Sequence, residues 1–242
     1  MKRSLTISEF FGPTIQGEGP SVGVPCHFLR LGFCNQHCVW CDTAYTWRFD
    51  NRWPHQDNVV YDEATELREV SVEQLVDIFN RFTTPLIVIS GGEPLMQARN
   101  LNLFIAGVLG RSKPPRIEIE TAGTLDPLRL ARAYDIDWNV SPKLSNSGNF
   151  PAVRYQPQIL TTLRDLGARF KFVVQTSTDF NEVAEIVRNI SIPSDRVYIM
   201  PEGRTQDAVQ GTMTNIVRAV IDRGWRITPR LHIDLWGSKR GV

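Results

Sequence analysis

Three cysteines lie within eight positions of the sequence, in the stretch FCNQHCVWCDT. Their spacing is C-x3-C-x2-C, at Cys34, Cys38 and Cys41. A structural zinc site usually takes four ligands in closed tetrahedral geometry, whereas three thiolates leave one metal position open for chemistry. The spacing therefore indicates a [4Fe-4S] cluster in which one iron is free to bind another molecule.

The fourth cysteine, Cys26, begins a predicted strand whose far end carries the other three. About seven residues at roughly 3.3 Å each separate the two ends by more than about 20 Å. A single extended strand cannot bring Cys26 to the same metal. The alternative from a different class is a zinc-binding adaptor, a colourless protein whose folding would depend on zinc.

Apolar runs alternate with amphipathic stretches along the chain, which is typical of strand–helix units in a parallel sheet. The apolar runs predict strands over 26–33, 86–90, 117–121, 137–141, 169–175, 196–200 and 225–232. The amphipathic stretches predict helices over 71–82, 97–109, 126–134, 157–167, 179–190 and 214–224. Ser71 and Gln74 fit a capping box at the start of the first helix. Residues 44–70 and 142–156 are less regular and are predicted to be loops.

The expected fold class is α/β, a partial (β/α) TIM-like barrel with about six core parallel strands and extra edge elements. We expect residues 1–242 to form a single domain. In such a sheet, function lies beyond the carboxyl ends of the strands. The glycine-rich and polar segments follow predicted strands at that edge: SGGEP (90–94), ETAGT (120–124), SPK (141–143) and MPEG (200–203).

Composition excludes several classes of protein. The chain has 242 residues, 42% of them hydrophobic, with 27 basic against 26 acidic residues. A balanced charge argues against a nucleic-acid-binding or membrane-surface protein. No apolar run follows the N-terminal MKRSLTISEF, and none approaches the roughly 18 residues of a transmembrane helix, so neither a signal peptide nor a membrane span is expected. Four cysteines, three of them clustered, favour metal or redox chemistry in a reducing cytoplasm over a disulfide scaffold.

The cysteine spacing together with GGEP (91–94) resembles the signature of the radical S-adenosylmethionine superfamily. Further stretches narrow the resemblance to one family within it, the 7-carboxy-7-deazaguanine synthases. These stretches are FGPTIQGEG (11–19), RLGFCNQHCVWCDT (30–43), IETAGT (119–124), SPK and the tail WGSKRGV (236–242). The resemblance covers nearly the whole chain.

The resemblance implies a ring contraction of 6-carboxy-5,6,7,8-tetrahydropterin to 7-carboxy-7-deazaguanine with loss of ammonia, in queuosine and 7-deazapurine biosynthesis. It implies a [4Fe-4S] cluster, S-adenosylmethionine and Mg²⁺ as cofactors. It also implies an external electron donor such as a flavodoxin or ferredoxin, and a homodimer. A glycyl-radical activase, which would share the cluster and GGEP, is the alternative among enzymes.

The resemblance also assigns roles to residues of this sequence. The cluster ligands would be Cys34, Cys38 and Cys41, and the Mg²⁺ ligand would be Thr43. The substrate-binding residues would be Ile15, Gln16, Gly17, Glu18, Arg30 and Ser90. The cofactor-binding residues would be Gly92, Glu93, Glu120, Ser141, Pro142, Lys143, Met200, Pro201, Glu202 and Gly203.

Several of these positions also fit structural explanations. Thr43 or Asp42 would serve equally as a helix cap. Arg30 would either grip the substrate carboxylate or form a surface ion pair. Lys171, in the middle of a predicted strand, is expected to face solvent, because an inward charge is costly unless it is used. His232, on the last predicted strand, fits a hydrogen-bonded core histidine as well as a site residue.

Overall fold

The structure is a computed structural model that describes residues 3–242 of the chain. Its framework is one nine-stranded sheet with the order β3-β1-β2-β4-β5-β6-β7-β8-β9. The strands are β1 (Ser4–Ile15), β2 (Pro25–Leu31), β3 (Arg68–Ser71), β4 (Leu86–Gly91), β5 (Arg116–Thr121), β6 (Asp137–Val140), β7 (Arg169–Val174), β8 (Val197–Pro201) and β9 (Arg226–Ile227). From β2 to β9 all neighbours are parallel. The predicted partial barrel is confirmed, and the sheet is open because its end strands, β3 and β9, do not pair with each other.

Strand β1 was not predicted from the sequence. It pairs antiparallel with both β2 and β3, so it extends the parallel sheet past β2. The side chains of Leu5 and Ile7 are fully buried while their neighbours Ser4 and Thr6 are half-exposed, the alternation of a strand with one face on the core. Two irregularities in its pairing with β2 interrupt this alternation beyond Ile7, which hid the strand from pattern analysis.

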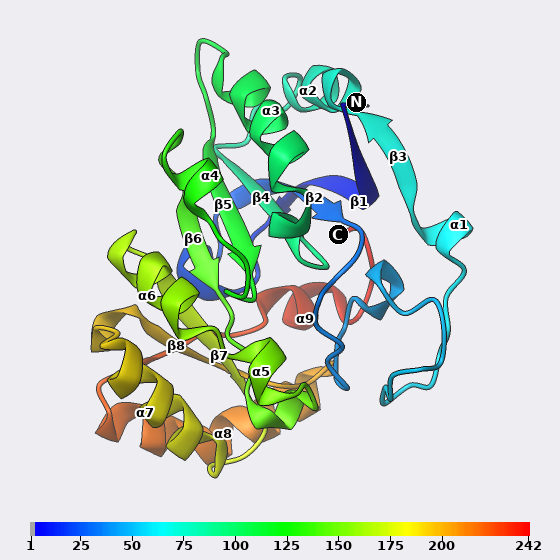
Figure 1. Cartoon of the computed structure of the whole chain (residues 1–242). Coiled ribbons are helices and arrows are strands. Elements are labelled where there is room, and N and C mark those ends of the chain that lie inside the picture. Colours follow the sequence, from blue (N-terminus) through cyan, green and yellow to red (C-terminus); the bar gives the residue numbers. More distant parts are fainter. Residues whose placement is uncertain (1–2) are drawn as a thin grey trace.

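Helices cover the outer face of the curved sheet (Figure 1). They are α2 (Val72–Phe79), α3 (Ala98–Leu109), α4 (Leu128–Ala131), α6 (Pro157–Asp165), α7 (Asp179–Ile190) and α8 (Gln206–Asp222). The capping box predicted for the first of these is present, since Ser71 and Gln74 hydrogen-bond reciprocally. The short helix α9 (Leu231–Trp236) lies on the inner side of the sheet with the cysteine loop.

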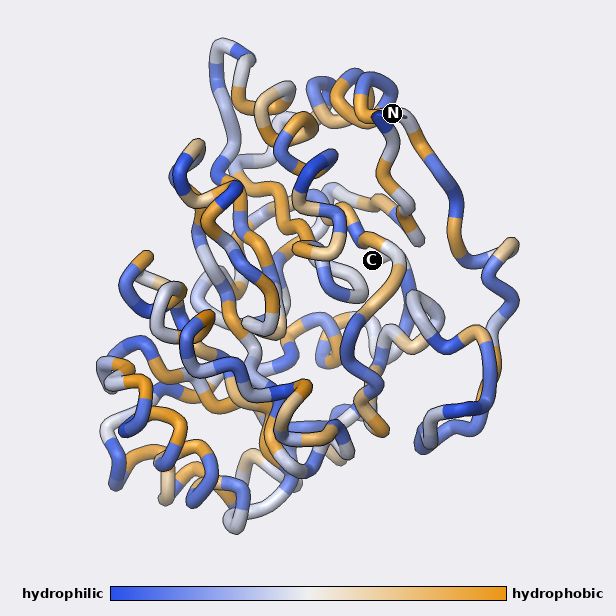
Figure 2. The backbone as a smooth tube through the Cα atoms, in the orientation of Figure 1, coloured by the Kyte–Doolittle hydropathy of each residue, from blue (hydrophilic) through white to orange (hydrophobic). Residues whose placement is uncertain are grey.

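The hydrophobic core fills the space between the sheet and these helices. Figure 2 shows hydrophobic residues along the central strands and hydrophilic ones along the long excursion before β3. The largest fully buried side chains include Phe79, Phe104, Phe170, Phe172 and Phe180. Burial of these rings fixes the helices against the strands, and the strands in turn fix the loops at their carboxyl ends. Within the described residues no helix has the length and apolar character needed to cross a membrane.

Several element boundaries differ from the prediction. The expected strand over 225–232 is wrong beyond Ile227, because Pro229 has no N–H for a ladder and the chain then turns into α9. Helix α8 starts eight residues earlier than predicted, where the Thr205 hydroxyl accepts a hydrogen bond from the Ala208 N–H. The helix expected over 126–134 is reduced to α4.

The two predicted loops contain short elements. Residues 44–70 include a 3₁₀ turn at Ala44–Thr46, helix α1 (Glu63–Glu66) and strand β3. Residues 142–156 include a 3₁₀ turn at Ser145–Ser147 and helix α5 (Pro151–Arg154). These pieces are too short for a periodic pattern to reveal them.

Candidate active site

A cavity of about 510 Å³ opens at the carboxyl edge of the parallel strands. This volume suits a small-molecule site. Most residues assigned by resemblance line it: Ile15, Gln16, Gly17, Glu18, Arg30, Cys34, Cys38, Cys41, Thr43, Ser90, Gly92, Glu120, Ser141, Lys143, Met200 and Glu202. Four assigned residues do not: Glu93, Pro142, Pro201 and Gly203.

The three clustered cysteines follow the carboxyl end of β2 and all line this cavity. Each sulfur receives a hydrogen bond from a different N–H group. The backbone N–H of Gln36 donates to Cys34 Sγ at 3.4 Å, Asn149 Nδ2 donates to Cys38 Sγ at 3.3 Å and Trp47 Nε1 donates to Cys41 Sγ at 3.4 Å. N–H donors around cysteine sulfurs are among the features that tune iron–sulfur clusters.

Burial raises the pKa of the Cys34 thiol well above its ordinary value and that of the Cys38 thiol to about 12. A thiolate is therefore costly at these positions without a neighbouring positive charge, which bound metal supplies. The three sulfurs, their donors and the shared cavity fit a cluster with three protein ligands. No group of three or more His, Cys, Asp and Glu side chains between residues 3 and 242 is placed to hold a single metal ion.

Cys26 lies at the opposite end of β2 from the cluster loop, as the sequence predicted. Its side chain is fully buried among Phe28, Leu86 and Val88. Burial, with the negative charges of two nearby glutamates, raises its pKa to about 12. It is an apolar packing residue and not a ligand.

The GGEP loop lies directly against the cysteine loop. The N–H groups of Gly92 and Glu93 donate to the carbonyls of Leu31 and Phe33 at 3.0 and 2.8 Å. A Cβ at Gly92 would lie 1.7 Å from the Phe33 carbonyl oxygen, so only glycine permits this approach. The two motifs of the sequence therefore form one surface, which suits a small molecule that must reach both the cluster and the glycine-rich loop.

Glu93 does not line the cavity, and its contacts indicate a structural role. Its side chain is fully buried, and its carboxylate accepts hydrogen bonds from the backbone N–H groups of Leu95 and Ala122 and from the Thr121 hydroxyl. These bonds join the end of β4 to the end of β5. Burial raises its pKa despite these donors.

Lys143 and two residues at the end of β8 form another part of the cavity wall. Lys143 Nζ donates to Ser141 Oγ at 3.0 Å and lies 5.8 Å from the centre of the Trp40 ring. Met200 and Glu202, at the end of β8, face the same cavity. Burial raises the pKa of Glu202.

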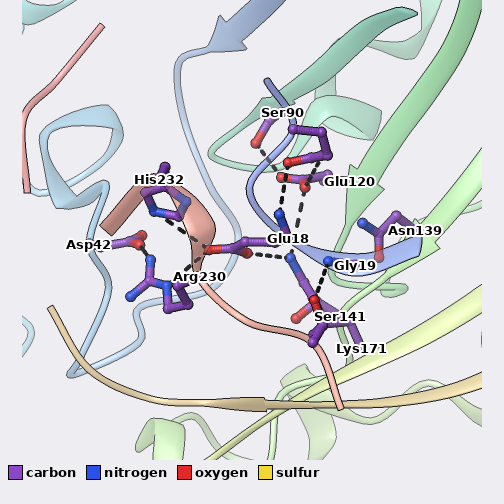
Figure 3. Close-up of polar contacts among 12 residues, drawn as sticks. Glu18, Gly19, Asp42, Ser90, Glu120, Asn139, Ser141, Lys171, Arg230 and His232 are labelled. Carbon is purple, nitrogen blue, oxygen red and sulfur yellow. Dashed lines mark hydrogen bonds and ion pairs between the residues drawn. The ribbon is translucent and has the colours of Figure 1, made fainter. Parts of the chain in front are cut away.

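The segment after β1 is fastened to β5 through its glutamine. Gln16 Nε2 donates to Glu118 Oε1 at 2.7 Å and to Glu120 Oε1 at 3.2 Å, and the Glu18 N–H donates to Gln16 Oε1 at 3.2 Å. Ser90 Oγ donates to the other oxygen of Glu120 at 2.8 Å (Figure 3). The strands β4 and β5 thus fix where residues 15–18 meet the cavity.

Glu18 is the centre of a buried ion network (Figure 3). Its carboxylate pairs with Lys171 Nζ at 2.6 Å and with Arg230 Nε at 3.0 Å, and His232 Nε2 lies 3.8 Å away. Burial alone would raise the pKa of Glu18, but Lys171 and Arg230 hold it well below its ordinary range. Glu18 is therefore an anion whose oxygens are already engaged.

The expectation that Lys171 faces solvent is wrong. Its side chain is 6% exposed, lines the cavity and lies between Glu18 and Glu120, which is 3.8 Å away. An inward-facing lysine is tolerated because two carboxylates compensate its charge. His232 is on α9 and not on a strand. It lines the cavity, and burial lowers its pKa.

Arg30 forms an ion pair, as one of its two explanations expected, but the pair is largely buried and lies at the cavity. Arg30 Nε pairs with Glu9 at 2.8 Å, its side chain is 15% exposed, and its guanidinium lies 5.8 and 5.9 Å from the ring centres of Phe11 and Phe28. Arg30 is also one of the residues that line the cavity. Tyr45 shares the Glu9 carboxylate at 2.9 Å.

Thr43 lines the cavity, and its side chain does not cap the short helix that follows it. Its hydroxyl lies 3.5 Å from Cys41 Sγ. Asp42 does not serve as the cap either, because its carboxylate pairs with Arg230. Thr43 therefore occupies the N-cap position of the turn Ala44–Thr46 through its backbone carbonyl alone, and the cap explanation is wrong for Asp42.

Neither Arg230, which lines the cavity, nor Glu118, which holds Gln16 in place, was predicted from the sequence. Glu118 is fully buried on β5 beside Gln16, and Ser21 Oγ donates to it at 2.5 Å. Glu118 could have been found from the sequence, because it is an acidic residue within the apolar run IEIET. A charge that is predicted to be buried in a sheet needs a partner. Arg230 had no signal, because its partners lie far away in the sequence.

The C-terminal residues 237–242 also line the cavity. Ser238 Oγ donates to the Arg204 carbonyl at 2.5 Å, and Arg240 pairs with Glu66 at 2.8 Å with its guanidinium 3.5 Å from the Tyr45 ring centre. The tail thus bridges the loop after β8 and the segment before β3. This placement agrees with the match at WGSKRGV.

Comparison with known proteins agrees with this geometry. Residues 29–202 match the family model of the radical SAM superfamily. The chain is similar to the 7-carboxy-7-deazaguanine synthase of Pyrobaculum aerophilum, with 33% identity over 98% of this chain and 97% of the relative. This chain belongs to the 7-carboxy-7-deazaguanine synthase family. The synthase of Bacillus subtilis is 29% identical over the full length of both chains.

A solved structure has the same architecture along nearly the whole chain. The crystal structure of QueE from Escherichia coli covers 95% of this chain and 95% of its own, with a TM-score of 0.67 and 26% identity. Membership of the radical SAM superfamily implies a [4Fe-4S] cluster and S-adenosylmethionine, which the cysteine loop and the GGEP loop fit. This membership favours the prediction of a radical S-adenosylmethionine enzyme over that of a zinc-binding adaptor.

Proposed function

We propose that this protein converts 6-carboxy-5,6,7,8-tetrahydropterin to 7-carboxy-7-deazaguanine and ammonia, as a carbon–nitrogen lyase of 7-deazapurine biosynthesis. The observation that carries the proposal is the position of residues 15–18. This segment lines the same cavity as the three cysteines, and it is held there by buried side chains. A radical formed at the cluster would therefore arise next to a substrate bound by that segment.

The substrate has a polar pyrimidine edge, a carboxylate and a reacting carbon between them. The backbone of residues 15–18 and the Ser90 hydroxyl offer acceptors and donors for the edge. Arg30 is available for the carboxylate, because a guanidinium has more donors than its bond to Glu9 uses. Glu18 is not proposed to bind the substrate through its carboxylate, since Lys171 and Arg230 occupy its oxygens.

When bound, the reduced cluster and S-adenosylmethionine supply the radical that starts the reaction. The cluster would be held by Cys34, Cys38 and Cys41. S-adenosylmethionine would be held by Gly92, Glu93, Glu120, Ser141, Pro142, Lys143, Met200, Pro201, Glu202 and Gly203. Of these, Glu93, Pro142, Pro201 and Gly203 are not among the residues that line the cavity, so we propose that they act by shaping the loops that bind S-adenosylmethionine.

A Mg²⁺ ion at Thr43 belongs to the proposal as well. Thr43 lines the cavity beside Cys41, and Mg²⁺ prefers oxygen ligands such as hydroxyl and carboxylate groups. Substrate oxygens would complete its shell. The further proposals are a single catalytic domain over the whole chain, a homodimer, and reduction of the cluster by an external carrier such as flavodoxin or ferredoxin.

The test is an anaerobic assay. The protein is reconstituted with iron and sulfide, reduced with dithionite and mixed with S-adenosylmethionine, Mg²⁺ and 6-carboxytetrahydropterin, and the products are followed by mass spectrometry. We expect 7-carboxy-7-deazaguanine from the wild type and none from Cys38→Ala. Formation of 5′-deoxyadenosine without the deazapurine would reject this substrate while keeping the superfamily, which is the result expected of an activase.

A further inference from the structure

Arg230 connects three segments of the site that are far apart in the sequence. Its Nε donates to Glu18 Oε1 at 3.0 Å, its Nη1 donates to the Gly203 carbonyl and its Nη2 donates to Asp42 Oδ2. The side chain lies between the carboxylates of Glu18 and Asp42 (Figure 3). Each nitrogen of the guanidinium thus binds a different segment.

The three segments have distinct places at the cavity. Glu18 ends the segment proposed to bind the substrate, and Asp42 lies between Cys41 of the cluster loop and Thr43. Gly203 follows β8 and is next in sequence to Glu202, which lines the cavity together with Met200.

The arrangement depends on the shape of the guanidinium as much as on its charge. The group is planar and its N–H bonds point in fixed directions, so it fixes the relative positions of its three acceptors. Arg230 is 5% exposed, and water cannot easily replace a lost contact. Burial alone would lower its pKa, but Asp42 and Glu18 keep the group charged.

The other oxygen of Glu18 is held by Lys171. The Glu18 carboxylate is therefore fixed from two sides, by β7 through Lys171 and by the residue that precedes α9. In the described part of the chain, Arg230 is the only side chain that hydrogen-bonds to both Glu18 and Asp42. Arg230 therefore sets the distance from Glu18 to the loop that carries the three cysteines.

We propose that Arg230 is a positioning residue that holds the substrate segment in register with the cluster loop and with the loop after β8. The proposal rests on the proposed function for its kinetic consequence. Arg230 itself need not touch the substrate. Its effect is on the distance between a substrate bound at residues 15–18 and a cofactor bound at the cluster, and a misplacement of about 1 Å can reduce the rate roughly 100-fold.

The first experiment compares Arg230→Lys and Arg230→Gln with the wild type. Arg230→Lys keeps the charge but cannot bind three acceptors in a plane. We expect kcat to fall roughly 100-fold while cluster content, measured by iron analysis and absorbance, stays at the wild-type level. Arg218→Lys is the matched control, since Arg218 pairs with Asp222 on the exposed face of α8. Wild-type kcat in Arg230→Lys would overturn the proposal.

A second experiment does not depend on activity. Hydrogen–deuterium exchange of the protein without cofactors should show faster exchange for peptides that contain residues 16–18 and 41–43 in Arg230→Gln. Exchange in β5 should be unchanged. Unaltered exchange in both segments would overturn the positioning role.

The two experiments also separate this proposal from the proposed function. If the wild type forms no 7-carboxy-7-deazaguanine, the proposed reaction fails, but the exchange experiment still decides the role of Arg230. Arg230→Ala with added guanidinium ion gives a further check. Recovery of exchange protection at residues 16–18 supports a positioning role, and a uniform loss of protection that guanidinium does not restore contradicts it.

Discussion

Replacing Lys171 by methionine should destabilise the protein strongly. The methionine keeps the apolar stem of the side chain but removes the charge that lies 2.6 Å from Glu18 and 3.8 Å from Glu120. The side chains of Glu18 and Glu120 are only 14% and 20% exposed, so water stabilises their negative charges poorly. Removing one partner of a buried ion pair costs about 3–5 kcal/mol, because the other charge stays buried.

The magnitude can be checked by thermal and urea unfolding of the protein without cofactors. For a chain of this size each kcal/mol lowers Tm by about 2–4 °C, so Lys171→Met should unfold roughly 6–20 °C below the wild type. Lys113→Met is the matched control, because Lys113 lies in an exposed turn after α3 and should change the unfolding free energy by less than about 0.5 kcal/mol.

A double-mutant cycle with Glu18→Gln isolates the pair. Because the glutamine carries no charge, Lys171→Met should cost much less in the Glu18→Gln background than in the wild type. Equal costs in both backgrounds, or a Lys171→Met variant as stable as Lys113→Met, would refute the buried network. Either result would instead support the solvent-facing position that was predicted for Lys171 from the sequence.

Three further predictions concern the cysteines, the glycine loop and the buried acid. Cys26→Ala should retain the iron and absorbance of the reconstituted wild type while Cys38→Ala loses them, and equal loss in both would contradict the assignment of ligands. Gly92→Ala should lower Tm and weaken S-adenosylmethionine binding by equilibrium dialysis, because its Cβ would lie 1.7 Å from the Phe33 carbonyl oxygen; wild-type binding would show that the loops can separate. Burial, and then the charge of a neighbouring glutamate, raise the pKa of Glu118. An unfolded glutamate ionises near about pH 4.3, so the native state holds its proton longer and the stability of the wild type should fall relative to Glu118→Gln as pH rises from about 4 to 8. A difference that is constant with pH would contradict the raised pKa.

The sequence by itself determined the repeating strand–helix architecture and the ends of the strands at which the site lies. A short apolar run such as LIVIS is typical of a strand buried on both faces, and the helical crossovers between successive runs make that sheet parallel. The local motifs were also decided by the sequence. The capping box at Ser71 depends on residues three positions apart, and the spacing of Cys34, Cys38 and Cys41 puts three thiols on one loop.

Only the tertiary structure decided which charges are paired inside the cavity. Lys171 and Glu18 are 153 positions apart, and Arg230 and Glu18 are 212 apart. The free-energy cost of burying a charge depends on its neighbours in space. Partners this far apart in the sequence cannot be recognised from a local sequence pattern. Strand β1 and helix α9 escaped prediction for a related reason, since their conformations depend on pairing with β2 and on the contact of the Leu231 N–H with the Gly17 carbonyl at 2.9 Å.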